Sequence, residues 1–101
     1  MNLDIRGLGF DPTPSVLQHA ERRLAFVLAR FTPLIRAVTM RLENLDTPRG
    51  GLDKRCRVAA VMEGQGALRT EATGADLYAV IDAAVDRLGR MVGRARERRD
   101  A

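Results

Sequence analysis

The chain has 101 residues, and the 46% that are hydrophobic are enough for one small domain with its own core. Its single cysteine excludes an internal disulfide framework and suits a reducing cytoplasm, and we expect neither a membrane-spanning segment nor a signal segment. The formal charge of +4 comes mainly from arginine, because all but one of the 17 basic residues are of that type. Arginine binds phosphate with a planar fork, but the base composition of the source genome can also produce such an excess.

The first third of the chain carries a strand signal followed by a helix signal. Residues 2–6 alternate between apolar and polar side chains and predict a short strand. Thr13 and Pro14 are typical of a helix start, and apolar residues at helical spacing continue to Phe31. Pro33 is expected to end this helix, since the residue before a proline resists helical geometry.

The middle of the chain predicts three strands joined by turns. Residues 35–45 and 54–62 alternate in polarity, and the turn-rich stretch 46–51 between them reads as an exposed loop. The glycines of residues 64–66 predict a tight hairpin turn, which leads into a short strand at residues 68–72.

Residues 73–99 predict one long amphipathic helix. Thr73, followed three residues later by Asp76, fits a capping box at its start. Gly89 and Gly93 each cost about 1 kcal/mol relative to alanine in a helix interior, so their spacing predicts close approach of a neighbouring backbone. The apolar stripe recurs at spacings of three and four and consists of Leu77, Ile81, Ala84, Val85, Leu88, Met91 (or Val92) and Ala95.

The element order β-α-β-β-β-α predicts an α+β fold, a two-layer sandwich formed by one domain over residues 1–101. Three consecutive strands joined by turns imply an antiparallel meander, to which the first strand adds as the fourth. Both helices must cover one face of this four-stranded sheet to bury their apolar stripes, which leaves the other face open. An uncovered sheet edge can pair with a second copy of the chain, so the sequence also allows a weak homodimer.

A row of arginines lies along the long helix, away from its apolar stripe, and consists of Arg87, Arg90, Arg94 and Arg98. Side chains at offsets of three and four stack along one side of a helix, so this arginine row points to a polyanionic partner. Cations near a helix C-terminus also offset the macrodipole, and the helix alone leaves both readings open. Because the chain is poor in aromatic residues, we expect a nucleic acid to be recognised through its phosphates and shape.

Catalytic and metal-binding constellations are missing from the sequence. The only histidine, His19, lies inside a predicted helix, and Cys56 occupies a strand-core position where cysteine acts as a small apolar residue. Asp82 and Asp86 share a helix face, and Asp86 precedes Arg90 by four residues, which favours helix stabilisation over acid–base catalysis. We therefore expect no enzyme activity, no cofactor, no metal and no small-molecule substrate.

The run from Asp76 to Asp82, continued by Asp86-Arg87-Leu88 and Arg90, resembles the second-helix signature of ribosome hibernation-promoting factors. Members of that family are also described as ribosome-associated inhibitors or sigma-factor modulation proteins. Four shorter matches support the resemblance: the strand ending at Gly7, the helix start at residues 13–24, the strand at residues 53–58 and the approach at residues 71–74. The matches span the chain in order, and the family fold is β-α-β-β-β-α.

The resemblance implies a function. Family members bind the small (30S) ribosomal subunit in the channel for messenger and transfer RNA, and they silence ribosomes under stress. Phe26 stands where the family often has a lysine, and long members carry a further C-terminal domain for dimerising ribosomes, so this chain resembles the short form. Matched position by position, the resemblance implies ribosomal RNA contacts from Arg23, Arg87, Arg90 and Arg94, with Arg98 extending the row.

We predict a non-enzymatic ribosome-binding factor that acts in the cytoplasm by occupying the RNA channel. The alternative is a protein-interaction module that regulates the transcription machinery through the open face of the sheet. The predicted outward residues there, Arg41, Glu43, Arg55 and Arg57, suit solvent better than an apolar partner. An enzyme ranks third, because the sequence lacks a catalytic constellation.

Overall fold

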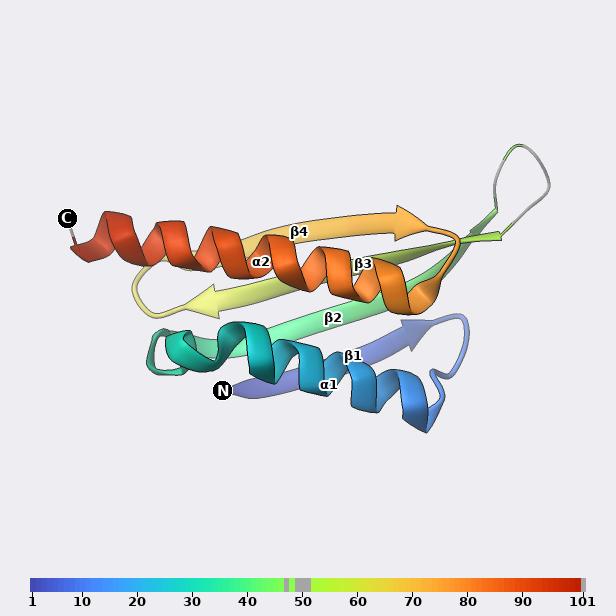
Figure 1. The fold of residues 1–101 in the computed structure, drawn as a ribbon, viewed down its shortest axis with the longest axis horizontal. Coiled ribbons are helices and arrows are strands. Elements are labelled where there is room, and N and C mark those ends of the chain that lie inside the picture. Colours follow the sequence, from blue (N-terminus) through green and yellow to red (C-terminus); the bar gives the residue numbers. More distant parts are fainter. Residues whose placement is uncertain (47, 49–51, 101) are drawn as a thin grey trace.

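A four-stranded sheet carries two α-helices on one of its faces (Figure 1). The computed structural model describes residues 1–46, 48 and 52–100, so most of the predicted loop at 46–51 lies outside the described residues. The elements confirm the predicted β-α-β-β-β-α order and α+β architecture, with one added 3₁₀ helix, η1. They are β1 (Asn2–Leu8), α1 (Pro14–Leu28), η1 (Ala29–Leu34), β2 (Ile35–Asp46), β3 (Leu52–Met62), β4 (Gly66–Gly74) and α2 (Leu77–Asp100).

The strands lie in the order β1-β2-β3-β4. β1 pairs with β2 in parallel, which requires a crossover connection, and α1 with η1 supplies it. The β2–β3 and β3–β4 pairs are antiparallel, so the predicted meander is confirmed. Register places Ile5, Met40, Val58 and Thr70 opposite one another across the sheet.

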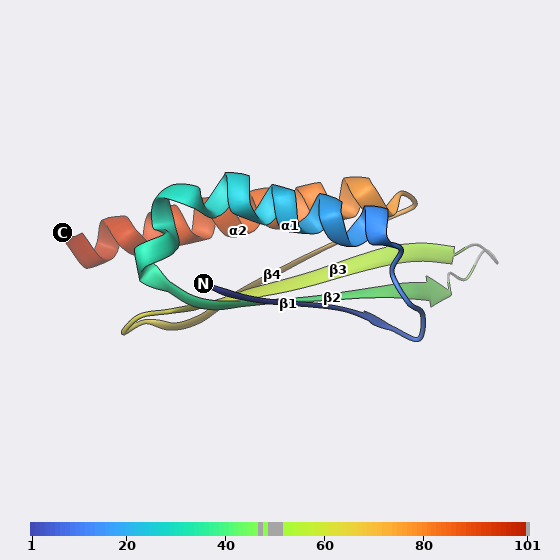
Figure 2. The ribbon, with the colours of Figure 1, turned by 90° about the horizontal axis from the view of Figure 1, so that it is seen from below.

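The core lies between the sheet and the helices, which Figure 2 shows together on one side of the sheet. The inward side chains of the two central strands, among them Met40 and Val58, are buried, and the opposite face of the sheet has no helix over it. The apolar stripe of α2 is confirmed, with Val92 rather than Met91 as its buried member. The buried helical residues are Val16, Ala20, Leu24 and Leu28 on α1 and Val80, Ile81, Ala84, Val85, Leu88, Val92 and Ala95 on α2.

The start of α2 differs from the sequence prediction. β4 continues to Gly74, and Thr73 pairs with Arg55 in the sheet instead of beginning a helix. Asp76 caps the helix itself, since its Oδ1 accepts a hydrogen bond from the backbone N–H of Tyr78 at 3.0 Å. The predicted capping box from Thr73 is therefore wrong, because strand pairing with β3 holds that residue extended.

The first helix begins as predicted and ends earlier. The Thr13 hydroxyl accepts a hydrogen bond from the backbone N–H of Val16 at 3.2 Å, which caps the helix that starts at Pro14. The α-helix ends at Leu28, and the chain then tightens into η1, so that Pro33 lies inside a 3₁₀ helix rather than after an α-helix. This turn brings the chain round to enter β2.

Cys56 is fully buried on β3, and its burial raises the pKa of the thiol to about 12. Because the thiolate is the reactive form, we expect the native protein to be alkylated more than about a hundredfold more slowly than the unfolded protein near the ordinary thiol pKa of about 8.5. Mass spectrometry of an alkylation time course, with and without denaturant, measures both rates. Similar rates in the two samples would contradict the placement of Cys56 in the core.

Candidate nucleic-acid interface

α1 and α2 lie side by side and run in the same direction along the sheet, so their C-terminal ends point the same way (Figure 1). The contacts between them keep a constant offset along the sequence. His19 Nε2 lies 2.7 Å from Asp82 Oδ1, and Arg23 Nη2 donates to Asp86 Oδ1 at 2.7 Å, each pair being 63 residues apart. A constant offset requires parallel helices, and it brings matching turns of the two helices together.

These interhelical polar contacts engage two carboxylates of α2, Asp82 and Asp86. Asp82 accepts from His19 and also lies 3.7 Å from Arg23 Nε, while Asp86 accepts from Arg23. His19 also meets the ring of Tyr78 edge-on, with centroids 5.0 Å apart. The two carboxylates therefore stabilise the helix pair rather than their own helix, and each partly exposed ion pair contributes at most about 1 kcal/mol.

The two glycines of α2 face α1 and the η1 segment that follows it. A Cβ atom at Gly89 would fall onto the side chain of Val27, so only glycine fits there without movement. A Cβ at Gly93 would lie 3.6 Å from Cζ of Phe31, which is ordinary van der Waals contact. Gly89 makes a close approach as predicted, but to the side chain of Val27 rather than to a neighbouring backbone, and the missing side chains leave a depression between the helices.

This depression is a groove of about 400 Å³, here named the interhelical groove. Three arginines border it, and no carboxylate of the described residues lies within ion-pair distance of any of them. Of the two acidic residues in its lining, Asp86 is already bound by Arg23, and Glu97 offsets part of the charge of the three arginines. The groove is lined by Val27, Arg30, Phe31, Asp86, Gly89, Arg90, Gly93, Arg94 and Glu97.

The structure brings two members of the predicted arginine row to the groove and leaves the other two outside its lining. Arg90 and Arg94 border the interhelical groove, whereas Arg87 donates a hydrogen bond to the backbone carbonyl of Glu71 in the edge strand β4. Arg98 follows Arg87 by eleven residues, or about three turns of 3.6 residues, so the two are nearly in line along the helix, and neither lines the groove. The groove thus gathers only the middle two members of the row.

The other predicted residue, Arg23, faces α2 and is held there by Asp82 and Asp86. Its guanidinium is neutralised inside the protein, so in the free chain it does not offer an open phosphate site. Whether it contacts RNA stays a prediction.

Arg30 is a groove residue that sequence reasoning missed. It lies in η1, after α1 has ended, and its place beside α2 depends on how the two helices pack. Its guanidinium carbon lies 5.2 Å from the ring centroid of Phe31, and Arg96 approaches the same ring at 4.8 Å. Such cation–π contacts hold the guanidinium near the groove. The one feature that could have indicated the position of Arg30 was the parallel crossover, because it places the C-terminal ends of both helices together.

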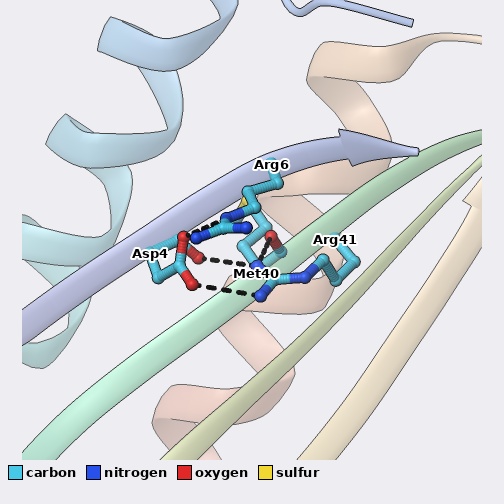
Figure 3. Close-up of polar contacts among 4 residues, drawn as sticks. All are labelled: Asp4, Arg6, Met40 and Arg41. Atoms are coloured by element: carbon cyan, nitrogen blue, oxygen red, sulfur yellow. Dashed lines mark hydrogen bonds and ion pairs between the residues drawn. The ribbon is translucent and has the colours of Figure 1, made fainter. Parts of the chain in front are cut away.

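On the open face of the sheet, unlike at the groove, arginines are paired with polar groups of the protein itself. Asp4 accepts from Arg6 Nε at 2.9 Å and from Arg41 Nη2 at 3.1 Å, and Arg41 Nη1 also donates to the backbone carbonyls of Asp4 and Met40 (Figure 3). The hydrogen bonds from Arg6 and Arg41 lower the pKa of Asp4 below its ordinary value. These arginines are therefore already engaged with groups of the protein itself.

The same pattern continues across the open face. Glu43 Oε1 lies 2.6 Å from Arg55 Nη2 and 3.2 Å from Arg57 Nη2. A hollow of about 350 Å³ on this face is bordered by three arginines, but two of them, Arg41 and Arg57, are paired, which leaves Arg69. Among the described residues, the helix side therefore offers the larger group of guanidinium groups without an ion-pair partner.

Other kinds of site find little support in the described part of the chain. Within residues 1–46, 48 and 52–100, no three histidine, cysteine or acidic side chains gather closely enough to hold a metal ion. Neither described α-helix combines the length and the apolar character needed to cross a membrane.

The chain matches a family model described as sigma 54 modulation protein / S30EA ribosomal protein over residues 3–100. It is similar to the solved N-terminal domain of Protein Y from Thermus thermophilus, with 29% identity, a TM-score of 0.75, and coverage of 93% of this chain and 98% of that one. It shares its fold with a ribosomal subunit interface protein from Coxiella burnetii, at 17% identity and a TM-score of 0.79, over 96% of this chain and 99% of that one. A search of curated proteins finds no match. Because the family match spans nearly the whole chain, the chain belongs to the sigma 54 modulation protein / S30EA family, the ribosome-associated hibernation factors that its second helix resembles.

Proposed function

We propose that this ribosome-associated protein binds small-subunit ribosomal RNA through the outer side of its two helices and inhibits translation by occupying the messenger and transfer RNA channel. The observation that carries the proposal is the group of three arginines at the interhelical groove, Arg30, Arg90 and Arg94, which have no ion-pair partner among the described residues. Binding alone blocks the channel in this proposal, without a catalytic step. A ribosomal partner also implies a cytoplasmic location.

The charge distribution supports the helix side as the RNA-binding side. Arginine forks are suited to phosphate oxygens, and phosphate contacts supply most of the affinity of sequence-independent nucleic-acid binding. Arginines on the open face, such as Arg41 and Arg57, would first have to leave Asp4 and Glu43. Arg87 and Arg98 extend the proposed contact along the β4 flank of α2, and Arg23 joins it if RNA displaces its carboxylate partners.

Co-sedimentation with purified small subunits tests this function. We expect binding to weaken by about 15- to 65-fold between roughly 50 and 200 mM salt, because neutralising about three phosphates gives a logarithmic salt slope of about −2 to −3. Failure to co-sediment at low salt would refute the proposal, and a slope near zero would refute its phosphate-based mechanism.

A single neutral substitution at the groove refines the salt test. Arg90→Gln is expected to reduce the steepness of the salt slope by about one, as one phosphate contact is lost. Arg57→Gln serves as the matched control, because Arg57 lies on the open face and is paired with Glu43. The control is expected to keep the wild-type slope.

A further inference from the structure

Phe26 is the most exposed large hydrophobic residue in the described part of the chain. Its side chain is 80% exposed, whereas the next, Leu8, is 41% exposed. Leaving a phenylalanine in water forgoes about 1.5–3 kcal/mol of burial free energy. An aromatic ring in this position therefore contributes little to the fold of the free protein.

The position of Phe26 on α1 points it away from the sheet. Two residues along a helix correspond to just over half a turn, so Phe26 lies opposite the buried Leu24 and Leu28. No element of the described chain lies over this outer side of α1 (Figure 2). The ring is thus presented on the same side of the molecule as the proposed RNA-binding surface.

Cations flank the exposed ring. Arg22 precedes Phe26 by four residues, about 6 Å along the axis of α1, and Arg30 follows it by four residues in η1, after α1 has ended. Both guanidinium groups lack a described carboxylate within ion-pair distance. Arg30 also borders the interhelical groove. An apolar flat surface between two free cations is complementary to a nucleotide, which combines a flat base with a phosphate.

We propose that Phe26 is a base-stacking residue, whose ring receives an unpaired base of the ribosomal RNA while Arg22 and Arg30 contact the adjoining phosphates. Sequence-specific and single-stranded RNA contacts commonly stack unpaired bases on aromatic rings. This inference rests on the proposed function and deepens it, since it adds a contact to a base to the contacts with phosphates. It also revises the expectation, drawn from the scarcity of aromatic residues, that stacking plays no part.

Four variants at this position test the proposal by small-subunit binding. Phe26→Ala is expected to weaken binding about 5- to 100-fold, as losing one stacked base does, and to leave the salt slope unchanged because no phosphate contact is removed. Phe26→Trp and Phe26→Tyr are expected to keep wild-type affinity, whereas Phe26→Leu, which is apolar but not aromatic, is expected to resemble the alanine variant. Because the side chain is exposed, all four should melt at the wild-type temperature.

The outcomes separate this inference from the function on which it rests. If the wild type binds small subunits and Phe26→Ala binds equally well, the stacking role fails while the proposed function stands. If Phe26→Leu binds as well as Phe26→Trp, a nonaromatic contact replaces stacking, and the inference is wrong. If the wild type does not bind small subunits, both fail together.

A photo-crosslinking residue at position 26 identifies the partner of the ring directly. Crosslinks to ribosomal RNA at an unpaired nucleotide are expected, and crosslinks to a ribosomal protein would overturn the proposal. The same crosslinker at Ala25, an exposed neighbour about 100° around the helix, is the matched control and should give a weaker or different product.

Discussion

Reversing the charge of Arg30, Arg90 and Arg94 to glutamate is expected to weaken small-subunit binding by at least about a thousandfold. Each of these arginines borders the interhelical groove without a described carboxylate partner. A hydrogen bond to a charged group contributes about 1.5–3 kcal/mol, so losing three exceeds about 4 kcal/mol before repulsion between glutamate and phosphate is counted. Equilibrium binding at fixed salt, measured by sedimentation or filter retention, gives the change.

A second triple variant controls for net charge. Arg6, Arg57 and Arg69 all lie on outward positions of the sheet, and reversing them changes the net charge of the chain by the same amount. We expect this variant to bind within about tenfold of the wild type, since only long-range attraction is reduced. Equal losses in the two triple variants would show that overall charge, and not the helix side, governs binding. Thermal melts establish that both proteins remain folded.

Gly89→Ala is expected to lower the free energy of unfolding by about 1–3 kcal/mol, although alanine is the better helix former. The added methyl group falls onto Val27, so either that side chain or the whole of α1 must move away from α2. For a domain of this size, a loss of this order lowers the melting temperature by about 4–8 °C per kcal/mol. Calorimetry or denaturant titration measures the change.

Gly93→Ala provides the matched comparison on the same helix. Its added methyl group meets Phe31 at an ordinary contact distance of 3.6 Å, so the gain in helix propensity, up to about 1 kcal/mol, is not opposed by a clash. Combining Gly89→Ala with Val27→Ala should recover part of the lost stability, because the second change removes the obstructing atoms. Equal stabilities of the two single alanine variants would contradict the close packing at Gly89.

The sequence predicted the architecture because every element carries a clear period. The alternating strands β2 and β3 and the amphipathic helix α2 each have one apolar face to bury, and the structure confirms the predicted buried face of each. The start of α2 was predicted wrongly, since Thr73 and Asp76 are both good capping residues and only the pairing of β4 with β3 decides between them. Strand pairing is nonlocal, so a local pattern could not make that choice.

The candidate site was less accessible to sequence reasoning. Arg90 and Arg94 were found because their spacing is a property of one helix. Arg30 was missed, and the internal pairing of Arg23 with Asp86 was not foreseen, because both depend on the parallel packing of α1 against α2. The exposure of Phe26, by contrast, agrees with the helical period, because a residue midway between the buried Leu24 and Leu28 lies on the opposite side of α1.

The two faces of the molecule differ in how they hold charge. On the open face, Asp4 and Glu43 neutralise the arginines beside them, so the face is polar with little free charge. On the helix side, Asp82 and Asp86 join the two helices, and the arginines of the groove have no ion-pair partner in the part of the chain that the structure describes. The same carboxylates that fasten α1 to α2 thereby keep the surrounding cations available to an anionic partner.

A structure of the chain bound to the small subunit, determined by electron cryomicroscopy, tests this account most directly. We expect the outer side of α1 and α2 to face ribosomal RNA, with guanidinium nitrogens of Arg90 and Arg94 about 3 Å from phosphate oxygens. A complex in which the open face of the sheet meets the RNA, with the interhelical groove turned to solvent, would contradict it.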